Sequence, residues 1–120
     1  MASIRYELAD DLYYAAMNNN LDLCVSLLEL GAPDWYGFEG AAQGGHFKLV
    51  KFFVSRGSEG YADAFCSAAS IGNKQIVQYI FDAHKAGDKD VVGGPLPVKL
   101  AHHDSLERGN KDMANFLLTL

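Results

Sequence analysis

The sequence has no long hydrophobic run, no apolar leader and little cysteine. No stretch approaches the roughly 18 apolar residues that a membrane span requires, so we expect no membrane-spanning segment. The first residues, MASIRYELADD, are acidic and lack the apolar core of a secretory signal, which favours an intracellular, cytoplasmic location. The two cysteines, Cys24 and Cys66, are predicted to be small core residues in a reducing compartment; a disulfide is the less favoured alternative.

Basic residues are also scarce. Lysine and arginine number 10 against 15 acidic residues, giving a net charge of −5. A nucleic-acid-binding protein needs a basic stripe, so this balance argues against that class. The glycines between Gly37 and Gly45 follow no predicted strand and precede no Lys-Ser or Lys-Thr pair, so they do not form a phosphate-binding loop.

One pattern recurs along the chain. The stretch 41–58 begins with two alanines, breaks at Gly44-Gly45, continues with an apolar stripe and stops at Gly57. The stretches 15–32, 68–85 and 105–120 repeat this plan. A helical hairpin of this size cannot bury its apolar face alone and needs a neighbour of the same shape. Equivalent stripe residues are Leu23/Cys24/Leu27, Leu49/Val50/Phe53, Ile76/Val77/Ile80 and Met113/Ala114/Leu117.

The pattern predicts a single all-α domain over 1–120, a short solenoid of about four stacked helix-turn-helix repeats. The predicted repeats are 3–32, 34–58, 60–85 and 97–120. We expect an exposed loop over 85–97, where Val91-Val92 either forms a short extended piece or packs back on the scaffold. Leu12, Phe38 and Phe65 are expected to fill equivalent core positions, and Asp34 to cap the helix that follows it. The predicted helices are 3–17, 21–30, 35–43, 46–56, 61–71, 73–84, 98–108 and 110–119.

The repeated residues resemble those of ankyrin repeats. The inner-helix alanine pair, the Gly-His turn and the closing glycine of that family correspond here to Ala41-Ala42, Gly45-His46 and Gly57-Ser58. The sequence departs from the family in spacing, since Ala16 and Ala42 are 26 positions apart whereas roughly 33 is typical. This shorter spacing predicts short turns in place of the projecting loops between repeats of that family. The resemblance implies a protein partner, and we expect no cofactor.

One cluster suggests chemistry. His102-His103-Asp104 is the best candidate for a metal or acid–base site, with Cys66 as a nucleophile. Adjacent helical residues diverge by about 100°, so the two histidines cannot share an ion without a third element. The thiol lacks an evident activating base. An enzyme or metal site is therefore the least favoured function.

Recognition of another protein is the favoured function, as an inhibitor or an adaptor. The inner helices and the turns leading into them should line a concave face, on which rigid aromatic residues mix with carboxylates. The carboxylates indicate a partner with a basic patch. The alternative reading of Trp35 and Tyr61 is that they only cover inter-repeat turns. A second function is self-association, as a homodimer for example, through an apolar C-terminal repeat. The predicted partner-binding residues are Asp10, Asp11, Tyr13, Tyr14, Trp35, Tyr36, Glu39, Tyr61, Asp63 and Lys99.

Overall fold

The computed structural model describes residues 2–88 and 92–120, with side chains from residue 7 onward. This part of the chain is all-helical, with eight α-helices and no strand. Each is too short or too polar to cross a lipid bilayer. Every helix boundary lies within two residues of its predicted position. The helices are α1 (Ala2–Met17), α2 (Leu21–Glu29), α3 (Asp34–Gln43), α4 (Phe47–Ser55), α5 (Tyr61–Ser70), α6 (Lys74–Ala86), α8 (Val98–Glu107) and α9 (Lys111–Leu117).

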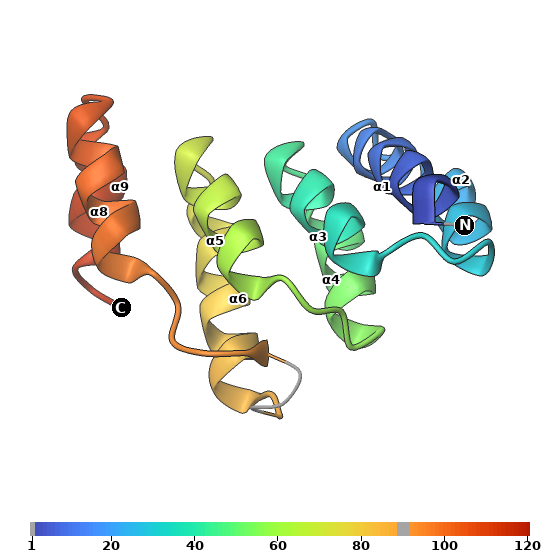
Figure 1. Ribbon diagram of the computed structural model, residues 1–120. Coiled ribbons are helices and arrows are strands. Elements are labelled where there is room, and N and C mark those ends of the chain that lie inside the picture. Colours follow the sequence, from blue (N-terminus) through green and yellow to red (C-terminus); the bar gives the residue numbers. More distant parts are fainter. Residues whose placement is uncertain (1, 89–91) are drawn as a thin grey trace.

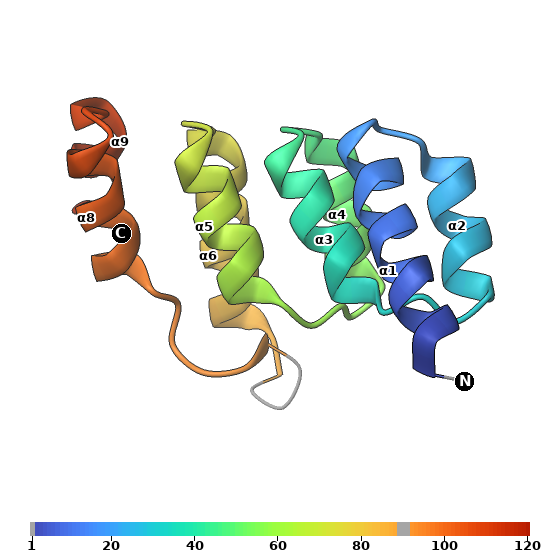
Figure 2. The ribbon, with the colours of Figure 1, turned by 45° about the horizontal axis from the view of Figure 1, so that its top comes forward.

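The helices form two rows (Figures 1 and 2). The inner row consists of α1, α3, α5 and α8, and each of these helices contacts the next. The outer row consists of α2, α4, α6 and α9, each joined to the inner helix before it by a short turn. The pair α1/α2 lies at one end of the molecule and the pair α8/α9 at the other, so that the long axis is 43 Å.

The four turns between paired helices have the same geometry. Each contains one residue in the left-handed region, with φ between 60° and 76°. Glycine adopts this conformation without steric cost and asparagine tolerates it, which explains these residue types. In three pairs the next residue is an asparagine whose Oδ1 accepts a hydrogen bond from the third backbone N–H of the outer helix, at 3.0–3.1 Å. The turn residues are Asn19, Gly45, Gly72 and Gly109, and the capping asparagines are Asn20, Asn73 and Asn110.

The second pair has His46 at the capping position and uses it differently. The His46 Nε2–H donates to the Met17 carbonyl oxygen at 2.7 Å, tying the turn of the second pair to the end of α1. Gly44 allows this close approach, because a Cβ there would lie 2.6 Å from the same oxygen. Gly40 plays the equivalent role one turn earlier in α3, where a Cβ would clash with the Tyr13 carbonyl.

The core lies between the two rows. Leu12, Phe38 and Phe65 are fully buried at the equivalent positions predicted for them. The outer helices contribute Leu49, Val50, Phe53, Ile76, Val77, Ile80, Met113, Ala114 and Leu117, all at most 3% exposed.

Three expectations need correction. Leu23 is 43% exposed rather than buried, because no helix packs against that side of α2 in the structure. Asp34 is the first residue of α3 rather than its cap, because Pro33 occupies the cap position. The negative charge of Asp34 is stabilised there by the positive end of the helix dipole. The segment after α6 is not entirely exposed, since Val92 is buried against Gly87. Val91 lies outside the described residues.

Candidate protein-binding surface

Acidic and aromatic side chains from successive inner helices lie close together. We call Tyr13, Glu39, Asp63, Cys66 and Asp104 the inner strip; they come from α1, α3, α5, α5 and α8. Burial and then the charge of Asp63 raise the pKa of Glu39. Burial, Glu39 and then Tyr14 raise the pKa of the Tyr13 hydroxyl. Tyr13 and Glu39 therefore each experience the negative charge of a carboxylate on the next inner helix.

Within the described side chains, those of residues 7–88 and 92–120, no ion pair offsets the negative charge of Glu39 and Asp63. Ion pairs are found at other carboxylates, for example between Asp112 and Lys74 and between Glu107 and His103. A positively charged group placed on the inner strip would relieve the repulsion between Glu39 and Asp63.

Aromatic rings flank the strip. Tyr13 and Tyr14 meet edge to face with ring centroids 5.3 Å apart, and Trp35 and Tyr36 lie 5.4 Å apart at the start of α3. Trp35 also packs against Gly60, where an added Cβ would lie 2.6 Å from its own Cβ. The base of the Trp35 side chain therefore lies against the turn into α5, and the residue remains partly exposed.

Tyr61 requires a correction, because it is only 4% exposed. Its ring packs edge to face on Phe38, with centroids 5.1 Å apart, and lies 5.9 Å from the His84 ring. Burial is the main cause of its raised pKa. Tyr61 belongs to the core and cannot offer its ring to a partner.

The remaining predicted residues do not share one surface. Asp11 and Tyr14 are exposed. They line a groove of 290 Å³ with Leu23 and Leu27, at the end of the molecule that the α1/α2 pair forms (Figure 1). Asp10 is exposed on α1, three residues from Tyr13 and so on the same side of the helix. Lys99 is exposed on α8.

The histidine cluster is split by its hydrogen bonds. His102 Nδ1 lies 2.9 Å from the Ala114 carbonyl oxygen of α9, whereas His103 Nε2 lies 2.9 Å from Glu107 one turn along α8. Across the described side chains, no three metal-ligating residues converge. Burial, Asp63 and Asp104 raise the pKa of the Cys66 thiol, and burial raises that of Cys24 to about 11, so both thiols stay protonated at neutral pH.

Sequence reasoning anticipated an apolar C-terminal repeat but missed the exposed leucines at the other end of the molecule. Leu106 and Leu118 are 50% and 70% exposed at one end, and Leu21 and Leu23 are exposed at the other. A signal was available in α2, where the apolar Leu21 stands at the position that Lys74 occupies in α6. Comparison with protein-family models, curated proteins and solved structures found no significant match to this chain.

Proposed function

We propose that this chain is a non-catalytic protein-binding module, an inhibitor or an adaptor, that takes a basic patch of its partner onto the inner strip. The observation that carries the proposal is the pair Glu39 and Asp63: the charge of Asp63 contributes to the raised pKa of Glu39, and neither carboxylate forms an ion pair among the described side chains. Repelling carboxylates on a surface lower stability unless something binds there.

The aromatic residues beside the strip favour a protein partner over a small cation. Tyr13, Tyr36 and Trp35 are partly exposed, rigid and adjacent to the carboxylates. Tyrosine and tryptophan contribute large contact areas at low entropic cost and are enriched at the energetic centres of interfaces. The carboxylates would chiefly increase the association rate and select a basic partner.

We also propose that the fold is a short solenoid of ankyrin-like repeats. Four turns of the same geometry and two rows of helices support this reading. In such a stack, the inner row presents equivalent side chains as columns, which suits an extended binding face. Two buried or half-buried thiols without a disulfide support a reducing, intracellular compartment.

Affinity capture with matched variants tests the proposed function. The wild-type chain, a strip variant with Glu39→Gln and Asp63→Asn, and a control variant with Glu29→Gln and Asp82→Asn are immobilised and exposed to the same lysates. Both variants lose two negative charges, but the control changes lie at exposed positions on the outer helices α2 and α6. We expect some proteins to be retained by wild type and control and lost from the strip variant. Equal retention by all three, with unchanged helical circular dichroism, would refute the role of the strip.

Self-association is the second candidate function. The specific observation in its favour is the exposed leucines of the α8/α9 pair.

A further inference from the structure

Contacts between neighbouring helix pairs are directional. In α1, Tyr13, Ala16 and Met17 face α3, which meets them with Gly40 and Gly44. In α5, Cys66, Ala69 and Ser70 face α8, which meets them with Ala101, Asp104 and Ser105. The turn residue is Asn19 in the first pair and Gly72 in the third. In both junctions, the residues that face the following pair lie six, three and two positions before the turn residue of their own pair. Every pair thus has a forward side and a backward side.

The forward side of the last pair is uncovered in the structure. Leu106 stands three positions before the turn, where the earlier inner helices have Ala16, Ala42 and Ala69, and it is 50% exposed whereas those alanines are buried. Leu118 stands nine positions after the turn, and it is 70% exposed whereas Leu28 is buried at the equivalent position of α2. We call Leu106, Leu118 and the nearby Lys111 the C-face.

The backward side of the first pair is uncovered as well. Leu23 is 43% exposed, whereas Leu49, Ile76 and Met113, which occupy the same position of the following three pairs, are all buried. It lines the 290 Å³ groove together with Asp11 and Tyr14. We call Leu23, Asp11, Tyr14 and the adjacent Asp22 the N-face.

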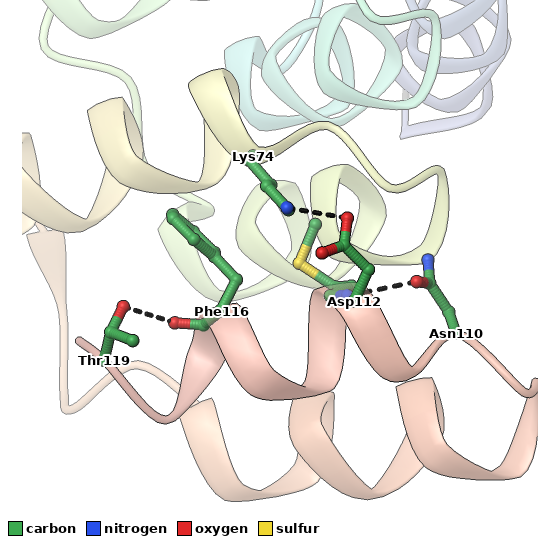
Figure 3. Close-up of polar contacts among 6 residues, drawn as sticks. Lys74, Asn110, Asp112, Phe116 and Thr119 are labelled. Atoms are coloured by element: carbon green, nitrogen blue, oxygen red, sulfur yellow. Dashed lines mark hydrogen bonds and ion pairs between the residues drawn. The ribbon is translucent and has the colours of Figure 1, made fainter.

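An ion pair inside the molecule shows how the charges of the two faces would match. Lys74 Nζ lies 2.6 Å from Asp112 Oδ2, joining α6 to α9 (Figure 3). Lys74 is two positions after the turn of its pair, and Asp112 is three positions after the turn of the next. The same forward position of the last pair holds Lys111, and the same backward position of the first pair holds Asp22. Both are exposed, and neither forms an ion pair within the described side chains.

We propose that the C-face of one chain binds the N-face of a second copy, continuing the order of helix pairs from chain to chain. Leu106 and Leu118 would enter the groove around Leu23 and Tyr14, and Lys111 would pair with Asp22 of the second copy. The groove provides the room that bulky side chains need, since Leu106 is larger than the alanines of the internal junctions. The two surfaces are different, so the contact is heterologous and leaves a free face at each end for further copies.

This self-association does not depend on the inner strip. The strip residues Glu39 and Asp63 lie on α3 and α5, away from both end faces. The strip variant described above is therefore expected to self-associate as wild type does, and failure of one proposal leaves the other standing.

Sedimentation velocity with face-blocked variants tests the proposal. Leu23→Arg places a cation on the N-face, opposite Lys111, and the double variant Leu106→Glu/Leu118→Glu places anions on the C-face, opposite Asp22. All three positions are exposed, so folding should be retained, which circular dichroism and urea unfolding check. Leu100→Glu is the matched control, an exposed leucine of α8 at the position that Asp63 occupies in α5.

We expect the wild-type chain and the control to form oligomers larger than dimers as the protein concentration rises to about 1 mM. At that concentration even an association with a dissociation constant of about 1 mM is detectable. Each face-blocked variant alone should stay monomeric. Their equimolar mixture should form a single 1:1 dimer that grows no further, because each partner retains one intact face. A wild type that is monomeric up to about 1 mM would overturn the proposal. So would an N-face variant that dimerises alone, since that result indicates a C-face to C-face contact.

A charge exchange tests the predicted ion pair. Lys111→Glu or Asp22→Lys alone should weaken association about two- to five-fold at low salt, the range expected for an exposed pair. Mixing the two variants should restore wild-type affinity between the C-face of the Lys111→Glu chain and the N-face of the Asp22→Lys chain, because the charges there are again opposite. Unchanged association in both single variants would remove Lys111 and Asp22 from the contact and overturn the proposed register.

Discussion

The first and last junctions of the inner row differ in how closely the helices approach. At the α1/α3 junction, Gly40 and Gly44 bring the backbone of α3 against the carbonyls of Tyr13 and Met17. At the α5/α8 junction, the side chain of Asp104 stands at the position of Gly40, five residues before the turn. The same repeated hairpin thus makes a close backbone contact in one place and a looser, more polar contact in another.

This difference indicates that one position per repeat sets the spacing of the stack. A glycine admits the neighbouring helix, whereas an aspartate keeps it away and adds a charge that must stay solvated. The last pair depends more on exposed polar contacts, such as Lys74 with Asp112, which contribute little to stability. We therefore expect α8 and α9 to open locally before the first three pairs unfold.

Removing a core ring should produce the largest effect. Phe53 is fully buried and its ring packs directly against Gly37. Phe53→Ala should lower the free energy of unfolding by about 3–5 kcal/mol in urea titration, through lost burial and a residual cavity. The neighbouring Phe52→Ala, at a half-buried position, is the control and should cost less than half as much. If Leu117→Ala, the equivalent change in α9, costs as much as Phe53→Ala, the last pair is as firmly packed as the others.

Adding a side chain at Gly40, in the α1/α3 junction, should have the next largest effect on the free energy of unfolding. Gly40→Ala would normally stabilise a helix by up to about 1 kcal/mol. Here the added Cβ clashes with the Tyr13 carbonyl, so we expect a loss of about 1–3 kcal/mol, measured by urea unfolding. Asp104→Ala, at the equivalent position of α8, should be neutral or stabilising. A gain in stability from Gly40→Ala would show that the two junctions have the same spacing.

The helix boundaries could be predicted because each turn has a local signature. A glycine or asparagine in the left-handed region precedes a cap, and an apolar stripe such as Leu49, Val50 and Phe53 follows it. The burial of Tyr61 could not be predicted in this way. The equivalent position of α3 holds Asp34, so this position of the repeat is apolar in one pair and charged in another. The Tyr61 ring is buried by Phe38, which belongs to a different pair.

The inner strip was predictable only in part for a related reason. Glu39 and Asp63 were expected on one surface because both lie on inner helices, and their charges do interact. Asp11 and Tyr14 were placed with them, although they line the groove at the end of the molecule. A one-residue step rotates a side chain by about 100° around a helix, so small errors in phase change the predicted surface.

The Lys74–Asp112 ion pair should make a small contribution to the last junction. A double-mutant cycle with Lys74→Gln and Asp112→Asn should give a coupling energy of about 0.2–1 kcal/mol, because both groups are substantially exposed. Hydrogen exchange of the α9 amides reports the opening of this pair directly. The coupling should fall as salt is added. Equal protection of α3 and α9 amides in the wild-type chain would contradict the expected difference between the junctions.

The smallest effect should come from Glu39, and its sign distinguishes a binding residue from a structural one. Burial, and then the charge of Asp63, raise the pKa of Glu39 in the folded state. At pH values between the ordinary glutamate pKa and this raised pKa, the folded chain therefore binds more protons than the unfolded chain. The stability that this group contributes is therefore present at low pH and lost toward neutrality. Glu39→Gln should raise the free energy of unfolding at pH 7 by up to about 0.5 kcal/mol and flatten the decline of that free energy as pH rises above the ordinary range of a glutamate pKa.

Asp63→Asn removes only the second cause of the raised pKa and should change the same pH profile less. Urea unfolding of both variants at several pH values provides the measurement. A gain in stability that accompanies lost partner binding would show that the carboxylate is retained for recognition at the expense of the fold. A loss of stability at pH 7 from Glu39→Gln would mean that the carboxylate supports the α3 helix in the free protein, and the inner strip would then lose its main support as a surface held for a basic partner.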